Sequence, residues 1–360
     1  MFANAIEFLK TFKKPALIIA AVAVVVFLVS FFLRFSSFHQ GFLDTQTMFV
    51  SADQGNSWTN NIYFTTQGFS GYPVTSMAEV DYGQDHSALV IGTGGYGLFV
   101  SFNDATSWSK INYAPTDQGY INDLFADSAG NLWVAENYGH QTILIEGMLD
   151  AHNTFQWSTK YSVYTPQNAI QAVAVDPARG VVYMTIGKSL LASTDGGKTW
   201  NDAFIFHYAI RQLFVTPGNG ALYAVTQNAV YKSTNGGTAW SSIVSPAIQG
   251  DIGSSPVSFF VDKGNDAILY IGYRTTLLRS IDSGRSWGRV PLLMNIPADI
   301  TAVYANPRAP YNIYAAAGSN MYVSYNGGDT WQVRNLSTAK KLALIFISIH
   351  DPNIVFVGLQ

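Results

Sequence analysis

The chain reads Ser193-Thr194-Asp195-Gly196-Gly197-Lys198-Thr199-Trp200 near its middle, and variants of this stretch recur along most of its length. Asp195 is placed to accept hydrogen bonds from the backbone amides of its own turn, and Gly197 can adopt the positive φ that closes the turn. The Thr-Trp pair that follows is typical of the start of a strand. The stretch therefore predicts a tight hairpin turn between two strands.

Related segments end at six other tryptophans, and two of these segments are degraded. Ala105 replaces the glycine in one of them, and only Asp150 and Trp157 are retained in the other. Successive tryptophans of the series are 40 to 50 residues apart, and a repeat of that length with four short strands is typical of a β-propeller blade. We predict that the turns depend structurally on Asp53, Asp104, Asp195, Asn235, Asp282, Asn326, Trp58, Trp108, Trp157, Trp200, Trp240, Trp287 and Trp331.

The ends of the chain indicate how the ring closes. Residues 345–358 read as the two inner strands of a blade with no outer strands after them, whereas the domain begins at residue 48 with outer strands that no inner strands precede. Pairing of residues 344–358 beside 48–65 would complete one blade and leave no open sheet edge at the seam. The sequence therefore predicts an all-β, seven-bladed β-propeller closed by its own two ends.

The repeated stretch resembles the Asp-box or BNR repeat, Ser-x-Asp-x-Gly-x-Thr-Trp, over about residues 47 to 360. This repeat occurs in sialidases, sortilin-type receptors, some xyloglucan-cleaving enzymes and the photosystem II stability and assembly factor family. The resemblance implies that the boxes lie on outer hairpins that support the blades. Among these relatives, the chain looks most like the photosystem II assembly factors. It has no Arg-Ile-Pro segment of the sialidase kind, and we expect no catalytic residues.

The N-terminal part has a different composition. Residues 15–33 are apolar and uncharged, and at about 1.5 Å per residue they are long enough to cross a bilayer as a helix. A cleaved signal peptide is the alternative, but the apolar run is long for one and no small-x-small cleavage site follows. Three lysines precede the run and one arginine follows it, which favours a cytoplasmic N-terminus. We predict a cytoplasmic segment 1–14, a transmembrane helix 15–33, a linker 34–47 and a periplasmic, lumenal or extracellular propeller 48–360.

Composition excludes several classes of function. Only 12% of the residues are charged and the formal net charge is −3. The protein therefore lacks the strong positive electrostatic field that would favour nucleic acid as a partner. The chain has no cysteine, and its six histidines show no metal-binding spacing. Residues 92–97 match the dinucleotide-binding spacing G-x-G-x-x-G, but the residues after them read as a strand instead of the required helix. We therefore expect no cofactor and no metal, and we interpret residues 92–97 as a hairpin turn.

The connections opposite the boxes are rich in tyrosine, phenylalanine and arginine, which are enriched where protein partners anchor. We predict a non-catalytic, membrane-anchored propeller that docks on an integral membrane protein complex and stabilises it or helps assemble it. The resemblance favours a photosystem or reaction-centre complex. The alternative is a cell-surface propeller that binds or hydrolyses glycans. The leading candidates for partner contacts are Tyr72, Tyr164, Phe206, Tyr208, Arg274 and Arg289.

Overall fold

The computed structural model describes one compact unit, Thr47–Gln360. Its described residues are 47–60, 63–64, 72–83, 86–113, 116–164, 169–245, 248, 250, 252, 255–262, 267–292 and 298–360. No helix in these parts of the chain has the length and apolar character needed to cross a bilayer. The predicted cytoplasmic segment, transmembrane helix and nearly all of the predicted linker lie outside the described residues.

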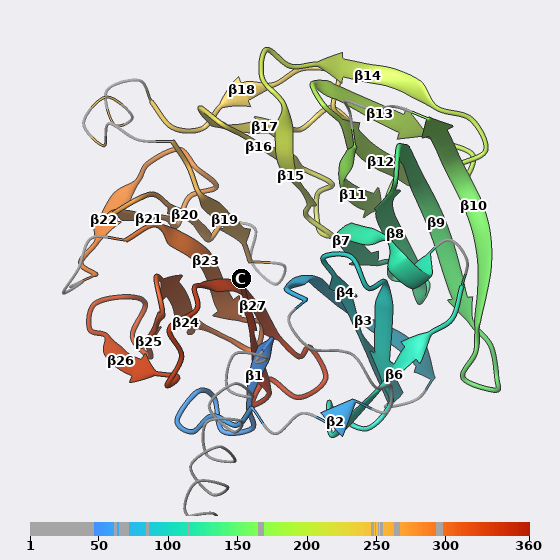
Figure 1. The fold of residues 1–360 in the computed structure, drawn as a ribbon. Coiled ribbons are helices and arrows are strands. Elements are labelled where there is room, and N and C mark those ends of the chain that lie inside the picture. Colours follow the sequence, from blue (N-terminus) through green and yellow to red (C-terminus); the bar gives the residue numbers. More distant parts are fainter. Residues whose placement is uncertain are drawn as a thin grey trace, which may run out of the picture. The chain divides into compact units, whose positions relative to one another are not determined.

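Seven antiparallel sheets are arranged as a ring of blades, so the chain is a seven-bladed β-propeller (Figure 1). Each complete blade follows the chain from its inner strand to its outer strand. The first two blades are β3(Val74–Gly83), β4(His86–Thr93), β5(Leu98–Ser101), β6(Ser107–Ile111), then β7(Tyr120–Ala126), β8(Asn131–Tyr138), β9(Gln141–Leu149), β10(Phe155–Tyr164). A 3-10 helix, η2(Thr116–Gln118), connects them.

The remaining blades continue the same order around the ring. They are β11(Ile170–Asp176), β12(Val181–Ile186), β13(Ser189–Ser193), β14(Asn201–Ile205); β15(Ile210–Val215), β16(Leu222–Thr226), β17(Val230–Ser233), β18(Ser241–Ser242); β19(Ser258–Val261), β20(Leu269–Gly272), β21(Leu277–Ser280), β22(Gly288–Val290); and β23(Ile300–Asn306), β24(Ala309–Ala317), β25(Asn320–Ser324), β26(Gln332–Asn335). The closing blade contains β27(Leu342–Ile347), β28(Val355–Leu359) and β1(Met48–Ser51).

The predicted closure is confirmed, because β1 pairs antiparallel with β28 from Met48 opposite Gly358 to Ser51 opposite Val355. The predicted fourth strand of this blade is not formed as a strand within the described residues. After Trp58 these residues make an isolated antiparallel bridge between Thr59 and Val50. The next short strand, β2(Tyr63–Phe64), pairs parallel with β6 of the neighbouring blade. The outer edge of β6 offers unpaired backbone groups, and β2 covers part of that edge.

The hydrophobic core lies between neighbouring sheets. Val90 and Leu98 of one blade, for example, share a buried cluster with Ile121 and Val134 of the next. Because both faces of a blade are covered in this way, middle strands such as β28 are buried along their whole length and read as continuous apolar runs. Burial between sheets thus holds each blade against its two neighbours.

The repeated turn around Asp195 has the predicted local geometry. The Asp195 carboxylate accepts hydrogen bonds from the Ser193 hydroxyl at 2.7 Å, the Thr199 amide at 2.9 Å and the Thr199 hydroxyl at 2.7 Å. These bonds hold the pKa of Asp195 well below its ordinary value. Gly196 and Gly197 have φ of 72° and 83°, and the Trp200 indole donates to the Gly197 carbonyl at 3.1 Å. The tryptophan therefore closes its own turn.

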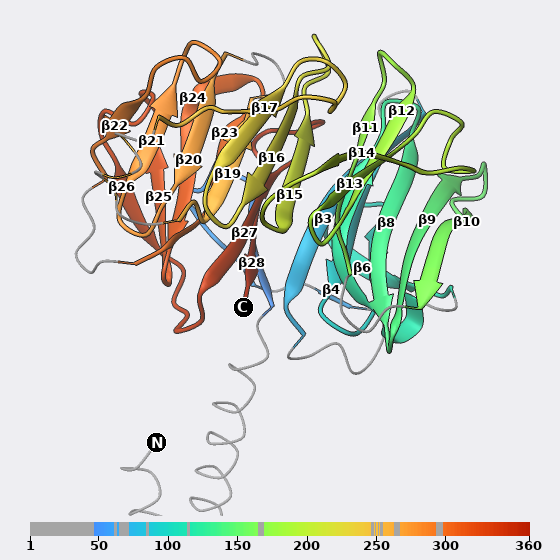
Figure 2. The same cartoon turned by 90° about the horizontal axis from the view of Figure 1, so that it is seen from above.

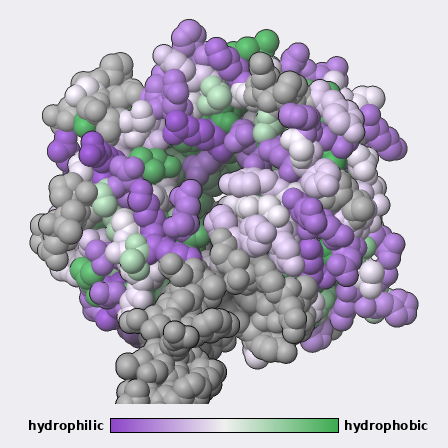
Figure 3. Space-filling view, viewed as in Figure 1, coloured by the Kyte–Doolittle hydropathy of each residue, from purple (hydrophilic) through white to green (hydrophobic). Residues whose placement is uncertain are grey.

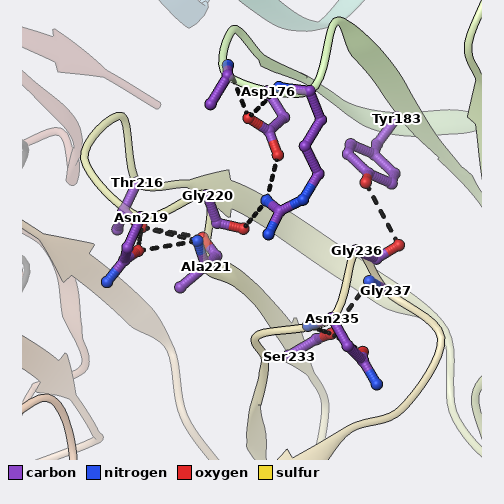
Figure 4. Close-up of polar contacts among 12 residues, drawn as sticks. Asp176, Tyr183, Thr216, Asn219, Gly220, Ala221, Ser233, Asn235, Gly236 and Gly237 are labelled. Atoms are coloured by element: carbon purple, nitrogen blue, oxygen red, sulfur yellow. Dashed lines mark hydrogen bonds and ion pairs between the residues drawn. The ribbon is translucent and has the colours of Figure 1, made fainter.

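Four of the turns also tie their blade to the preceding one, which the sequence did not indicate. The carbonyl just before the closing glycine accepts a bond from the neighbouring blade at several turns. Tyr183 donates to Gly236 at 3.3 Å (Figure 4) and Lys232 donates to Ser283 at 3.3 Å. Gly327 accepts from Arg279, and Gln54 accepts from Tyr314.

A second inter-blade contact lies beside the Tyr183 contact in Figure 4. Asp176 is fully buried, and one of its carboxylate oxygens lies 2.6 Å from the Arg179 guanidinium. The same guanidinium nitrogen donates to the Gly220 carbonyl of the next blade at 3.0 Å. This end of the ring is thus held together by polar contacts as well as by the core.

Two structural roles predicted for the degraded turns need correction. The side chain that holds the turn at 101–108 belongs to Asn103, which accepts from the Ser101 hydroxyl and the Ser107 amide at 3.0 Å each. Asp104 instead occupies the left-handed position next to the closing residue, with φ of 51°. Asp150 holds a turn of its own through the amides of His152 and Thr154. Trp157 does not close that turn. It lies within strand β10.

Candidate docking face

The two ends of the ring differ in composition. The repeated turns lie at one end. The other end, which we call the docking face, includes the connections 93–98, 116–120, 138–141, 205–210, 273–276 and 335–342. Strand β28 and strand β10 both end at the docking face, and the C-terminus lies there, at the lower end of the ring in Figure 2. Figure 3, viewed as Figure 1, shows a mainly hydrophilic surface with isolated hydrophobic spots around a central hollow.

The inner strands carry a recurrent bulge where they leave the docking face. The register shifts after the first or second residue of six inner strands, at the positions of Thr75, Asn122, Gln171, Arg211, Thr301 and Ala343. Several bulged side chains reach a carbonyl at the start of the next inner strand. Thr75 donates to the Ile121 carbonyl at 2.6 Å, and Asn122 donates to the Ile170 carbonyl. These bonds fix the spacing of the blades around the channel mouth.

An aromatic and basic cluster lies on the docking face between the first two blades. Tyr72 stacks on Tyr96 with ring centroids 5.0 Å apart. The Lys110 ammonium lies 4.1 Å from the Tyr96 ring centroid and donates to the Asp117 carbonyl at 2.7 Å. Tyr120, which is 47% exposed, begins the next inner strand. Together these side chains form a platform of rings with one cation held above it.

The Gly-rich run 92–97 builds this platform. A strand, β5, follows it, as predicted for a hairpin turn. Gly95 and Gly97 adopt φ of 115° and 73°, which a residue with a side chain rarely does. A Cβ at Gly94 would lie 2.8 Å from Pro73, so only glycine lets this turn pack against the chain next to Tyr72.

Three other predicted contact residues lie on the docking face, at separate blades. Tyr164 ends β10 and is 78% exposed. Tyr208 is half-buried in the connection between β14 and β15, with its ring edge-on to that of His207 at 4.6 Å. Arg274 is exposed in the turn between β20 and β21. The structure therefore places these residues on one face, without gathering them into a single cluster.

The remaining two candidates occupy different positions. Phe206 is only 5% exposed, and its ring packs edge-on against those of Tyr231 and Trp240. Phe206 therefore belongs to the hydrophobic core beneath the docking face. Arg289 is exposed on the outer strand β22, where it pairs with Leu278. It therefore lies on the outer wall of the ring.

Sequence reasoning missed Tyr96, Lys110, Tyr120 and Tyr138, of which Tyr138 is 46% exposed at the end of β8. Tyr96 was overlooked because the glycines around it suggested only a turn. Lys110 could have been found, since it is the only basic residue of β6 and lies one residue before the strand ends. Its position over a ring from another strand was not visible in the sequence.

Two buried carboxyl groups of the blade β7–β10 have raised pKa values. Burial raises the pKa of Asp123 to about 7, although its carboxylate accepts from the amides of Val173 and Leu124. Burial, with a contribution from the charge of Asp117, raises the pKa of Glu136 to about 7. Glu136 is fully buried under the docking face, where a Cβ at Gly119 would lie 1.6 Å from one of its oxygens.

Neither carboxyl has the surroundings of a hydrolytic pair. A glycosidase needs two carboxyl groups that flank a common substrate cleft, whereas Asp123 is engaged by backbone amides and Glu136 is covered by the chain. In the described parts of the chain, no three acidic or histidine side chains are grouped so that they could hold a metal ion.

The fold thus defines the chain as a β-propeller, with aromatic and basic side chains at one end of its ring. Residues 102–261 match the family model of the DUF6242 beta propeller domain. No curated protein matches the chain in sequence.

Several solved structures share the fold. The GH74 xyloglucanase from Xanthomonas campestris has a TM-score of 0.62 at 17% identity, covering 80% of this chain and 51% of its own, so the chain spans about half of that enzyme. YCF48 bound to a D1 peptide has a TM-score of 0.58 at 16% identity, covering 80% of this chain and 94% of its own. YCF48 from Cyanidioschyzon merolae has a TM-score of 0.58 at 14% identity, covering 80% and 95%. At these identities the similarity establishes a β-propeller fold.

Proposed function

We propose that this protein is a non-catalytic, membrane-anchored, extracytoplasmic propeller that docks on a membrane protein complex and stabilises it or helps assemble it. The observation that carries the proposal is the exposed aromatic and basic docking face, with Tyr164, Arg274 and the Tyr72, Tyr96 and Lys110 platform. Exposed aromatic rings and arginines are the side chains that anchor protein partners most often.

Two further points support this function. One solved propeller of the same fold is YCF48 bound to a D1 peptide, so the fold can present a peptide-binding surface. The repeated turns fit the Asp-box interpretation, in which the boxes support the blades, because their polar groups are used within the turn and by the preceding blade. The opposite end is therefore the better candidate for binding.

The position of the chain's entry into the ring also favours the docking face. Thr47 accepts a hydrogen bond from the Leu359 amide at 2.9 Å, at the end of β28 that lies on the docking face. A linker at 34–47 would reach at most about 50 Å when extended. If the helix 15–33 spans the membrane, such a linker gives the domain a millimolar effective concentration near a membrane partner, so a modest contact is sufficient.

The test uses the full chain, purified with its partners in mild detergent. The double variant Tyr164→Ala/Arg274→Glu changes two exposed residues of the docking face. Tyr311→Ala/Lys198→Glu is the matched control, because Tyr311 is 67% exposed and Lys198 is exposed at the opposite end of the ring. Urea unfolding of both variants checks that the propeller stays folded.

We expect the docking-face variant to lose the co-purifying complex while the control retains it. If both variants retain the complex in equal amount, the assignment of the face is wrong. Loss of the complex only from the control would move the binding site to the end that carries the repeated turns.

A further inference from the structure

A pocket of about 620 Å³ lies on the outer wall of the ring, between the blade of β15–β18 and the blade of β19–β22. Figure 1 shows these two blades as neighbours in the ring. It is formed where the outer strand is shortest, because β18 has only two residues. Its walls include Lys232 and Thr234 from one side and Arg285 and Trp287 from the other, with Ser241 and Ser242 along the short strand. The pocket is separate from the docking face, and its lining includes none of the proposed partner-contact residues.

The lining of the pocket is selective in its chemistry. It contains two basic side chains, several hydroxyl groups and one tryptophan, and no Asp or Glu is among its residues. The nearest carboxylate in the sequence, that of Asp282, accepts from the Ser286 amide and hydroxyl at 2.8 and 2.6 Å, and is thus engaged within its own turn. The charged side chains that line the pocket, Lys232 and Arg285, are therefore both basic.

The walls of the pocket are held in place by the contacts of the ring. Lys232 donates to the Ser283 carbonyl at 3.3 Å, and its ammonium lies 5.2 Å from the Tyr223 ring centroid. The Trp287 indole donates to the Ile243 carbonyl at 2.7 Å. The basic group and the indole are therefore positioned before any ligand arrives, which lowers the cost of ordering them on binding.

We propose that this pocket binds a small sugar that carries an oxyanion, such as a sugar phosphate or a sugar acid. Lys232 and Arg285 would receive the oxyanion, because charge-assisted bonds to such groups are the strongest that these side chains make. The hydroxyls of Thr234, Ser241 and Ser242 match the alternating donors and acceptors of a polyol. The volume lies within the range of pockets that enclose small ligands.

The experiment uses the full chain in mild detergent and follows the indole N–H signals of its eight tryptophans by NMR. Trp287→Phe assigns the signal from the pocket. Glucose 6-phosphate, glucuronate, glucose and inorganic phosphate are titrated separately. We expect the Trp287 signal to shift saturably with glucose 6-phosphate or glucuronate, at concentrations at least about tenfold below those needed for glucose or inorganic phosphate.

Arg285→Gln should weaken binding of the anionic sugar about tenfold or more, because it removes one charge-assisted contact. Arg211→Gln is the matched control, since Arg211 is an exposed arginine outside the pocket and its loss should leave binding unchanged. Equal binding of glucose and glucose 6-phosphate would overturn the role of the cations. Equal binding of inorganic phosphate and glucose 6-phosphate would overturn the role of the hydroxyls, and unchanged binding by Arg285→Gln would overturn the site.

Discussion

Alanine substitution at the two adjacent glycines of the central turn should have different costs. Gly196 and Gly197 both have positive φ, 72° and 83°, so an alanine at either position adds about 1 to 2 kcal/mol of backbone strain. At Gly196 the added Cβ would meet nothing within 4 Å. At Gly197 it would lie 3.0 Å from the Lys160 Cβ of the preceding blade and 3.2 Å from two further carbons of that side chain.

Lys160 cannot move away freely, because its ammonium is paired with Glu146 at 2.8 Å. Crowding at such a site adds about 1 to 3 kcal/mol. We therefore expect Gly196→Ala to lower the free energy of unfolding by about 1 to 2 kcal/mol, and Gly197→Ala to lower it by about 2 to 5 kcal/mol. Urea unfolding of the full chain in mild detergent, followed by tryptophan fluorescence, measures both values.

A second substitution isolates the contact between blades. Glu146→Ala releases the Lys160 side chain, so it should recover part of the extra loss in the Gly197→Ala background and nothing in the Gly196→Ala background. Equal destabilisation by the two alanine variants would show that the turn does not pack against the preceding blade. If the loss of unfolding free energy in Glu146→Ala/Gly197→Ala equals the sum of the losses in the two single variants, the ion pair does not hold Lys160 in place.

Three other predictions test the closure, the buried acid and the N-terminus. Deleting residues 344–360 removes β27 and β28 and leaves β1 without its partner, so cooperative urea unfolding should be lost; a truncated protein with the parental midpoint would contradict the closure. The native state holds a proton on Glu136 up to about pH 7, whereas the unfolded chain releases it near 4.5, so the free energy of unfolding should fall as the pH rises between these values. Glu136→Gln should make the free energy of unfolding depend less on pH, and the remaining dependence should come from Asp123, whose pKa is also raised. An unchanged pH dependence would refute the burial of the Glu136 carboxyl group. Intact-mass measurement should find residues 15–33 in the mature protein, and an N-terminus near Ser36 would show that they are cleaved.

The number of blades and the order of their strands could be predicted because both depend on local patterns. The Asp195 turn specifies its own hydrogen bonds within seven residues, and the interval between tryptophans gives the repeat. The blade at 170–205 accordingly has its four strands where the sequence predicted them. The closure followed from the same pattern, since each end of the chain carries half of a blade.

Contacts between blades could not be predicted, because their partners are far apart in the sequence. Tyr183 and Gly236 are separated by 53 residues, and no local pattern marks a tyrosine of a middle strand as the donor to a turn. The platform at Tyr96 was missed for the same reason, since Lys110 reaches it from another strand. The error at Asp104 has a different cause. The prediction chose Asp104 because it has a carboxylate, and passed over the amide of Asn103. The spacing from Ser101, and not the charge, determines which side chain accepts the hydrogen bonds of the turn.

The two ends of the ring therefore differ in how well their side chains can be substituted without loss of the fold. At the end that carries the repeated turns, the carbonyls of Gly236, Ser283, Gly327 and Gln54 accept bonds from the preceding blade, so a substitution that displaces one of these carbonyls alters both a turn and a contact between blades. At the docking face, the corresponding ties are made by the bulges at the start of the inner strands, close to the channel. Side chains farther out, such as Tyr164 and Arg274, carry no such constraint. A partner-binding surface can change there without loss of the fold, which is the physical reason to place the docking function at that end.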